Sequence, residues 1–360
     1  MSFNTIPVKL QDRCYNVLVG TRLLAECGSR IREAGLEGTC AVVTDSIVAR
    51  LYGEEVVRSL SSTGILPLVI EVPAGENSKS LALVETVCDR MIEGGLDRKS
   101  FVVALGGGVV GDLAGFVAAI YYRGVPCVQI PTTIIAQVDS AVGGKTGVNA
   151  AGGKNLIGAF HQPRLVIADV TTLGSLPPRE RNQGFAEIIK HGVIRDREML
   201  TSLETSGDGD LSTLISRNVA IKAAIVVADE FEISGERALL NFGHTIGHAI
   251  ENAAGYGRLF HGEAISLGIV AACDLSVRIA GLPEAAREFV KELLRCHNLP
   301  TQLPGDIATG RIIEAIKTDK KFAKGEIRFV LSAGLGSAFV SENVKMADIE
   351  SAIEALRQPI

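Results

Sequence analysis

Glu187, His244, His248 and His261 are the residues of this chain whose types and spacing could hold a metal ion. The chain has only six histidines, and two of them stand four residues apart in an apolar stretch. Two or three imidazole nitrogens and a carboxylate, with one coordination position left open, are typical of catalytic zinc. We therefore expect a metal centre that still has room for a substrate.

The spacing within this group leaves two interpretations open. Residues four apart share a helix face, so His244 and His248 could both be ligands, as in the H-E-x-x-H pattern. The glutamate that follows the first histidine of that pattern is missing, however, so a metalloprotease would lack its general base. Glu187 and Lys190 also share a face of an apolar helix, where an unpaired carboxylate is costly to bury. A simple ion pair between them is the alternative.

A glycine-rich segment, Gly106 to Asp112, follows the apolar run FVVAL and precedes a second apolar stretch. Between a strand and a helix, such a segment lets a pyrophosphate approach the backbone and the helix N-terminus. A tight turn without a ligand would give the same pattern. Asp45 ends an earlier predicted strand, and it could equally bind a ribose or cap the next helix.

A second dense segment runs from Arg123 to Asn155 and contains Asp139, Lys145 and Lys154. Each lysine follows a pair of glycines, an arrangement that suits anionic groups held at short range. A flexible surface loop with solvated lysines is the other interpretation.

The elements that must position these residues change character along the chain. Short apolar runs at 15–19, 40–44, 68–72, 101–105, 127–130 and 165–168 alternate with helical stretches, which predicts an α/β domain with a Rossmann-like parallel sheet. After Pro177-Pro178, long helical patterns predominate at 179–200, 211–229, 236–253, 261–280 and 284–296, followed by a small hairpin near 327–340 and a closing helix from about 346. We predict an α/β domain over 1–178 and a mainly α-helical domain over 179–360, with the active site in the cleft between them.

Composition excludes several classes of protein. The net charge of −5 argues against a partner such as nucleic acid, which requires a dense positive surface. Seven cysteines are scattered singly, as is typical of reduced thiols. The N-terminus lacks a signal-peptide pattern, and no run of about 18 apolar residues is found, so we expect a cytoplasmic protein without a membrane partner.

Several long motifs, taken together and in order, resemble the 3-dehydroquinate synthase family. They are GGGVVGDLAGFVAAIYYRG, VQIPTTIIAQVDSAVGGKTGVN, GGKNLIGAFHQP, LPPRERNQGFAEIIKHGVI, IKAAIVVADE, ERALLNFGHTIGHAIE, HGEAISLGIVAA and DKKFAKGEIRFVL. The resemblance covers almost the entire chain.

This resemblance implies a divalent metal, zinc or cobalt, bound by Glu187, His244 and His261. It assigns His248 to the substrate and its proton transfers instead. It also implies the cofactor NAD, which would meet Asp45, Glu76, Asn77, Lys79, Gly108, Val109, Val110, Gly111, Asp112, Thr132, Thr133, Lys145, Lys154, Thr172, Leu173, Gly174 and Ser175.

The implied substrate is the phosphorylated sugar acid 3-deoxy-D-arabino-heptulosonate 7-phosphate. By resemblance, the catalytic residues are Asp139, Lys145, Lys190, His248 and Arg123, and the substrate-binding residues are Lys154, Asn155, Lys222, Arg237, Asn241 and Lys321, with Lys320 as the alternative to Lys321. The resemblance also implies a homodimer in which Arg123 reaches a phosphate across the interface. The reaction would be oxidation, phosphate elimination, reduction, ring opening and aldol closure, without net oxidation.

Three alternatives remain on sequence grounds. Another sugar-phosphate cyclase would also bind the metal and NAD, and it would differ in the residues that bind the carboxylate and the ring of the substrate. A metal-dependent polyol dehydrogenase would accumulate NADH and would not need so many lysines. An inactive NAD-binding protein would have no reason to keep Glu187, His244 and His261 together with Asp139 and Lys145.

Overall fold

The computed structural model describes residues 3–206, 209–255, 257–318 and 328–357. The chain divides into two compact units, Met1–Leu176 with Asp210–Phe231, and Pro177–Gly209 with Glu232–Ile360. The predicted boundary at 178/179 is close to the division at 176/177. Residues 210–231, which the sequence analysis assigned to the second domain, pack with the first unit. The assignment of functional domains stays a prediction.

A mixed sheet forms the centre of the first unit. Within the described residues it has the strand order β1-β2-β9-β6-β5-β3-β4, in which only β1 and β2 pair antiparallel. The strands are β1 (Phe3–Val8), β2 (Tyr15–Gly20), β3 (Thr39–Asp45), β4 (Leu66–Val72), β5 (Phe101–Gly106), β6 (Cys127–Pro131) and β9 (Leu165–Asp169). The predicted parallel sheet is confirmed. The edge strand β1 is an addition that the sequence analysis did not predict.

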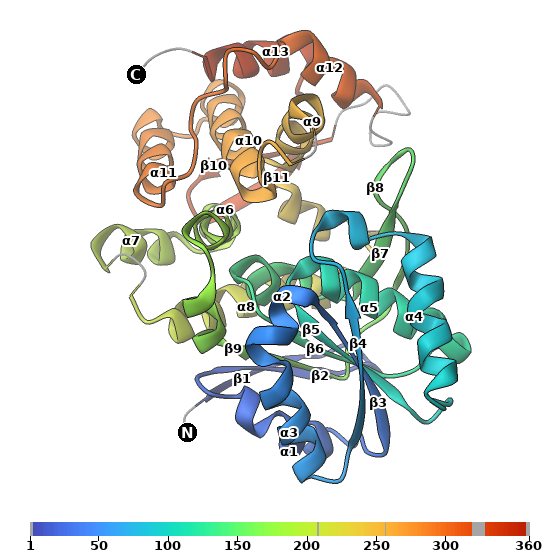
Figure 1. Cartoon of the computed structure of the whole chain (residues 1–360). Helices are drawn as coiled ribbons and strands as arrows, with labels where there is room; N and C mark the ends of the chain where they lie inside the picture. The colour runs from blue at the N-terminus through green and yellow to red at the C-terminus, as the bar shows by residue number, and fades with distance from the viewer. Residues whose placement is uncertain (1–2, 207–208, 256, 319–327, 358–360) are drawn as a thin grey trace. The chain divides into compact units, whose positions relative to one another are not determined.

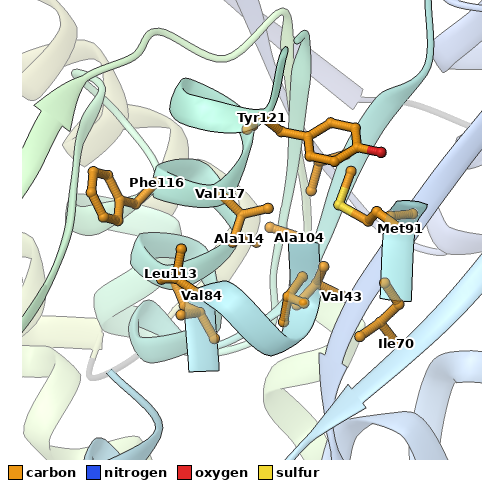
Figure 2. Packing of buried hydrophobic residues seen from close by; sticks show 14 of the residues in the cluster. Val43, Ile70, Val84, Met91, Ala104, Leu113, Ala114, Phe116, Val117 and Tyr121 are labelled. Carbon is orange, nitrogen blue, oxygen red and sulfur yellow. The ribbon is translucent and has the colours of Figure 1, made fainter. Parts of the chain in front are cut away.

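Both faces of this sheet are covered, so its inner strands are apolar throughout. Ala41 and Val43 of β3 pack toward α4 (Leu81–Glu93) and α5 (Gly108–Ile120), whereas Cys40 and Val42 pack toward α1 (Cys27–Glu33) and α3 (Glu54–Ser62). Figure 1 shows these two pairs of helices on either side of the sheet, and Figure 2 shows the α4–α5 side with Val43, Leu113 and Val117 in one packed cluster. Continuous apolar runs of this kind are typical of a sheet buried on both faces.

The remaining elements of the first unit are short apart from one helix and one hairpin. The antiparallel pair β7 (Lys145–Ala150) and β8 (Gly153–Phe160) packs beside α5, and α8 (Leu211–Ala228) packs against β1, β2 and η5. The short helical turns are η1 (Leu24–Glu26), α2 (Ser46–Val48), η2 (Ala49–Gly53), η3 (Glu76–Ser78), η4 (Tyr121–Arg123), η5 (Ala136–Ser140) and η6 (Val170–Ser175).

Helix α8 is also the one helix, within the described part of the chain, that is long and apolar enough to cross a membrane by length and composition alone. Arg217 and Lys222 interrupt it, which explains why the sequence analysis found no continuous apolar run. In this structure it packs against β1 and β2 within the first unit. The predicted cytoplasmic location remains a prediction.

The second unit is mainly helical, as predicted. Its helices are α6 (Pro178–Arg195), α7 (Arg197–Ser206), η7 (Arg237–Asn241), α9 (His244–Ala254), α10 (His261–Leu275), η8 (Ser276–Ala280), α11 (Glu284–Cys296), α12 (Thr309–Thr318) and α13 (Met346–Ala355), with a hairpin of β10 (Phe329–Gly334) and β11 (Ser337–Ser341). The single helix predicted over 179–200 is two helices, because the backbone leaves the helical region at Asp196 (φ −147°, ψ 82°).

The predicted continuous helix over 236–253 is also wrong, and the break matters for the site. Gly243 adopts a left-handed conformation (φ 77°, ψ −17°), which separates η7 from α9 and makes His244 the first residue of a new helix. Glycine adopts this conformation without steric cost, whereas other residues are strained in it. The sequence NFGH therefore encodes a sharp turn that periodicity alone did not reveal.

Glycines also set how closely α9 and α10 cross. A Cβ placed on Gly268 of α10 would lie 1.9 Å from the carbonyl oxygen of Gly243 and 2.9 Å from the Cα of Gly247. These atoms belong to the backbone, so a side chain at this position could not be accommodated by a rotamer change. This close crossing holds α9 and α10, which begin at His244 and His261, in a fixed position relative to each other.

We predict that Gly268→Ala lowers the free energy of unfolding by about 1–3 kcal/mol, because the added methyl forces the two helix backbones apart. Gly310→Ala is the matched control, since Gly310 is exposed on α12 and its added Cβ would meet no atom within 4 Å. That control should change stability by less than about 1 kcal/mol. Urea denaturation of both variants measures the difference, and equal effects would contradict the close crossing.

Candidate metal centre and ligand-binding edge

Glu187 is a fully buried carboxylate on α6. Its relative exposure is 0%, and neither carboxylate oxygen has a hydrogen-bond partner, although Oε2 forms an ion pair with Lys190 one turn along the same helix. Burying a charge without hydrogen bonds is expensive, so a carboxylate of this kind is retained where another positive group completes its environment. The Glu187–Lys190 ion pair, which was the alternative interpretation of the sequence, is present, and it leaves the carboxylate incompletely satisfied.

Two histidines from two other helices converge on the same carboxylate oxygen. Nε2 of His244 and Nε2 of His261 each lie 3.4 Å from Oε1 of Glu187. Both histidines are the first residues of their helices, α9 and α10, which places their rings at the ends of rigid elements. The structure thus brings together three residues that are separated by 57 and 17 positions in the sequence.

The remaining ring nitrogens of these two histidines are engaged elsewhere. Nδ1 of His244 lies 3.2 Å from the carbonyl oxygen of Phe242, and Nδ1 of His261 lies 3.5 Å from Oε2 of Glu251. Acceptors beside one ring nitrogen fix the tautomer that leaves the other nitrogen able to bind a metal. Sequence reasoning missed Glu251, although its position three residues after His248 in an apolar helix was a usable signal.

These distances fit a metal better than a hydrogen-bonded cluster. A metal that binds nitrogen and oxygen at about 2.0–2.1 Å sets neighbouring tetrahedral ligands about 3.3 Å apart. The two 3.4 Å separations are close to this value and are long for charge-assisted hydrogen bonds. Glu187, His244 and His261 could therefore hold a divalent ion and leave a fourth position for another ligand.

His248 lies next to this group. The ring atoms of His244, His248 and His261 can supply ligand atoms within 4.8 Å of one another, so a three-histidine set is a geometric alternative. His248 stands one turn after His244 on α9, and the two ring centroids are 5.2 Å apart. The assignment of His248 to the substrate stays a prediction.

The charges of this cluster influence one another. Burial would raise the pKa of Glu187, but the Lys190 ammonium and the two imidazoles hold it well below its usual range. Burial and the nearby Lys190 lower the pKa of His244. Burial would also lower the pKa of His261, yet its two carboxylate partners, Glu187 and Glu251, raise it to about 9. Glu187 is therefore ionised in this environment and able to bind a cation.

In the first unit, the residues predicted to bind NAD gather at one edge of the sheet. β3 ends at Asp45, β5 at Gly106, β6 at Pro131 and β9 at Asp169, and these parallel strands all present their carboxyl ends at the same edge. The residues that follow these ends include Gly108, Thr132, Thr133 and Thr172. Ligands of open α/β sheets bind at such an edge.

The glycine segment has the strand-turn-helix context that the sequence predicted. Gly107 precedes the first turn of α5 and has no side chain to cap it, so the N–H groups of this turn are available to an anion. A Cβ on Gly108 would lie 3.0 Å from Oγ of Ser140, and one on Gly111 would lie 2.8 Å from Oε1 of Gln129. Gly111 thus lies close to the Gln129 side chain of β6, and the turn itself could receive a phosphate.

Asp45 occupies the position of a helix cap. Its Oδ1 accepts hydrogen bonds from the backbone N–H groups of Ile47 (2.9 Å) and Val48 (3.1 Å). This observation confirms the capping interpretation of the sequence pattern. The ribose interpretation stays a prediction, and it is compatible with the cap because both capping hydrogen bonds go to Oδ1.

A network at this edge connects residues from three separate motifs. Nζ of Lys79 donates to Oδ2 of Asp112 at 2.6 Å and to Oδ1 of Asn155. Asn149 donates its side-chain N–H to Glu76 at 2.9 Å and accepts the backbone N–H of Asn155 at 2.9 Å. Asn149, which the sequence analysis did not single out, therefore ties the segment 74–79, which contains Glu76 and Lys79, to the turn between β7 and β8.

Asp139 and Lys222 also meet, from positions 83 residues apart. Nζ of Lys222 on α8 donates to Oδ1 of Asp139 at 2.5 Å and to the carbonyl oxygen of the same residue. Because α8 packs against η5, which carries Asp139, the lysine is held at a fixed place in the first unit. Two predicted functional residues thus share one ion pair.

The other residues predicted to bind substrate or NAD lie in different local environments. Arg237 in η7 is buried, Asn241 at the end of η7 lies 3.4 Å from Glu232, and Arg123 has a left-handed backbone (φ 69°). Oγ of Ser175 accepts a hydrogen bond from the Tyr52 hydroxyl at 2.6 Å, and the same hydroxyl contacts the carbonyl oxygen of Thr172. Lys145 and Lys154 lie on β7 and β8, whereas Lys320 and Lys321 lie outside the described residues. The remaining residues that were predicted to bind NAD lie in short or helical elements: Asn77 is in η3, Val109 and Val110 are in α5, and Leu173 and Gly174 are in η6.

Comparison with known families accounts for most of this chain. The family described as 3-dehydroquinate synthase N-terminal matches residues 69–183, and the family described as 3-dehydroquinate synthase C-terminal matches residues 184–322. This chain belongs to the 3-dehydroquinate synthase family. The resemblance inferred from the sequence motifs is confirmed.

Full-length relatives support the same family. The chain is 46% identical to the 3-dehydroquinate synthase of Desulforamulus reducens over 96% of this chain and 98% of the relative. It is also 46% identical to that of Symbiobacterium thermophilum over 98% of this chain and 100% of the relative. Such coverage leaves both units of the chain within the family.

Solved structures show the same fold in related cyclases. A 2-deoxy-scyllo-inosose synthase complexed with carbaglucose-6-phosphate, NAD+ and Co2+ has a TM-score of 0.88 and 27% identity, covering 98% of this chain and 99% of the other. The 2-epi-5-epi-valiolone synthase of Streptomyces hygroscopicus with NAD+ and Zn2+ bound has a TM-score of 0.86 and 30% identity, covering 95% and 96%. A glycerol dehydrogenase of Schizosaccharomyces pombe, at 18% identity and a TM-score of 0.64, shares the fold alone.

We predict that Lys79→Met lowers the free energy of unfolding by about 1–3 kcal/mol at pH 8, because it leaves the partly buried Asp112 carboxylate without its cation. Burial raises the pKa of Asp112, and Lys79 opposes this increase. Without Lys79, folding therefore favours the protonated carboxyl, so the loss should shrink as the pH falls toward 5 and grow as it rises.

Urea denaturation at several pH values measures this dependence. The double variant Lys79→Met with Asp112→Asn is the matched control, because it has no carboxyl at this position to titrate. Its stability relative to the native protein should vary less with pH than that of Lys79→Met. A loss of equal size at all pH values for the single variant would show that Asp112 is not the group responsible.

Proposed function

We propose that this protein converts 3-deoxy-D-arabino-heptulosonate 7-phosphate into 3-dehydroquinate and phosphate, with NAD and one divalent metal as cofactors. The observation that carries the proposal is the 46% identity to curated 3-dehydroquinate synthases over nearly the full length of both chains. This activity is a lyase reaction that belongs to the shikimate pathway of aromatic amino acid biosynthesis.

The metal would be held by Glu187, His244 and His261. Support comes from the buried carboxylate without hydrogen bonds and from the two Nε2 atoms at 3.4 Å. A related cyclase contains Co2+ and another contains Zn2+, and this donor set suits either ion. When bound, the metal would polarise the C5 oxygen of the substrate, and NAD would accept and return the C5 hydride.

The NAD site would lie at the carboxyl edge of the sheet. The first turn of α5 supplies backbone N–H groups for a pyrophosphate, and the Lys79–Asp112–Asn155 network fixes the segment beside it. Both related cyclase structures contain NAD+. We propose that the remaining predicted NAD residues, from Asp45 to Ser175, line the same site.

The substrate carries a carboxylate and a phosphate, so the protein must supply cations locally despite its net charge of −5. Lys145, Lys154, Lys190, Lys222 and Arg237 would provide them. Lys222 is oriented by its ion pair with Asp139, and Lys190 by its ion pair with Glu187, which reduces the entropy lost when an anion binds. Asn155 and Asn241 would bind substrate hydroxyls.

Proton transfers would be the task of His248, which stands beside the proposed metal ligands without being assigned as one of them. A histidine titrates near neutral pH and can pass a proton in either direction. The leaving phosphate itself would accept the C6 proton during elimination. The rest of the protein's contribution is orientation of the substrate and exclusion of water.

We predict that the purified protein with NAD releases phosphate from the heptulosonate phosphate in equal amounts with 3-dehydroquinate, without steady accumulation of NADH. Removal of the metal by a chelator should abolish turnover, and Zn2+ or Co2+ should restore it. Glucose 6-phosphate, which lacks the carboxylate, is the matched control substrate. Preferred turnover of that substrate would indicate another sugar-phosphate cyclase, and NADH accumulation with glycerol would indicate a polyol dehydrogenase.

We also propose that the protein is a homodimer in which Arg123 acts on the phosphate bound to the partner. The left-handed backbone at Tyr122, Arg123 and Gly124 (φ 48°, 69° and 122°) holds this segment in a conformation that non-glycine residues rarely adopt. Such strain persists where surrounding structure or function requires it. Light scattering should give twice the mass of one chain.

Subunit complementation tests the trans arrangement. Arg123→Ala and Lys222→Met should each reduce turnover by about 100-fold or more, because each removes a cation that binds developing negative charge. After the two variants are unfolded together and refolded, mixed dimers would contain one site with both residues intact. Activity should return to about a quarter of the native value, as expected for random pairing in a twofold dimer. No recovery would show that Arg123 acts within its own chain.

A further inference from the structure

Glu251 is a buried glutamate at a position in its helix where a carboxylate is energetically unfavourable. It lies in the last turn of α9 (His244–Ala254) and is only 7% exposed. The carboxyl end of a helix carries partial negative charge, so a carboxylate in the last turn is disfavoured by the helix dipole. Burial adds a desolvation cost. An ordinary core position of this helix would be better occupied by an apolar residue, as at Ile250.

The structure shows what offsets this cost. Oε2 of Glu251 lies 3.5 Å from Nδ1 of His261, whose Nε2 lies 3.4 Å from Oε1 of Glu187. His261 thus stands between two carboxylates, one on each side of its ring. His244 differs, because its Nδ1 faces the neutral carbonyl oxygen of Phe242. The two histidines that face Glu187 therefore have partners of unequal charge.

The distance between Glu251 and His261 is set by the helix crossing. α9 and α10 are in direct contact through Gly243, Gly247 and Gly268, where added side chains would collide with backbone. The start of α10 is fixed separately, since Glu263 accepts the backbone N–H of Phe260 and forms an ion pair with Arg179 at 2.6 Å. Both the ring and its carboxylate partner are thus attached to rigid elements.

We propose that Glu251 is a positioning residue for the metal centre, which accepts the Nδ1–H of His261 and keeps its Nε2 free to bind the metal. This inference rests on the metal site of the proposed function. The negative charge of Glu251 also makes the ring a stronger donor to a cation. The competing interpretation is a structural ion pair that stabilises the fold and has no effect on the metal.

Glu251→Met separates these interpretations, because methionine has a similar volume and neither charge nor a strong acceptor. We predict that this variant binds Zn2+ about 10–100-fold more weakly, measured by competition with a chromophoric chelator. In the metal-free protein this variant removes one partner of a buried ion pair, so a loss of stability in urea is expected under either interpretation and does not separate them. A purely structural ion pair would leave the Zn2+ affinity within about threefold of the native value.

Glu251→Gln provides a second, milder change that keeps an acceptor atom and removes only the charge. Its affinity should lie between those of the native protein and Glu251→Met, and the d–d absorption of the Co2+ form should stay closer to the native spectrum than that of Glu251→Met. Glu263→Gln is the matched control on α10. It should lower thermal stability, because it weakens the helix start, with Zn2+ affinity within about threefold of the native protein.

A double-mutant cycle with His261→Ala tests whether Glu251 acts through that ring. If it does, Glu251→Met should change the Zn2+ affinity of the His261→Ala protein by less than about threefold. Equal effects in both backgrounds would overturn the proposal, as would native affinity in both Glu251 variants. If the native protein itself fails to bind Zn2+ or Co2+, the metal assignment of the proposed function fails instead.

Discussion

The buried carboxylate of Glu187 is the interaction on which the architecture of the second unit depends. A charge with 0% exposure can be kept only where positive groups reach it, and three elements supply them: Lys190 from α6 itself, His244 from α9 and His261 from α10. The glycines at the α9–α10 crossing allow the two histidines to come this close. The buried charge of Glu187 and the close packing of α9 against α10 therefore depend on each other.

The first unit obeys a different constraint, which is topological. Parallel strands must present their carboxyl ends at the same edge, so residues that follow β3, β5, β6 and β9 are collected there without any direct attraction between them. Side-chain pairing then fixes the details. The Lys79–Asp112 and Lys222–Asp139 pairs hold cations in place with carboxylates, which suits a protein that must bind anions while carrying a net negative charge.

Much of the fold could be predicted from the chain because the signals were local. The apolar runs that became β2, β3, β5 and β6 were recognisable by composition, and α11 begins and ends where its pattern predicts. The wrong and missed predictions of secondary structure also had local causes. The left-handed Gly243 ended a helix that periodicity continued, and the antiparallel strand β1 was missed because an exposed edge strand lacks a strong apolar pattern.

The sequence by itself determined the family, the residue types of the metal group and the glycine segment between a strand and a helix, because these depend on short motifs and their order. Only the tertiary structure decided which partners those residues have. Glu251 beside His261, Asn149 beside Glu76 and Lys222 beside Asp139 are contacts between residues 10 to 83 positions apart. Such contacts follow from how helices and strands pack, and spacing along the chain carries no information about that packing.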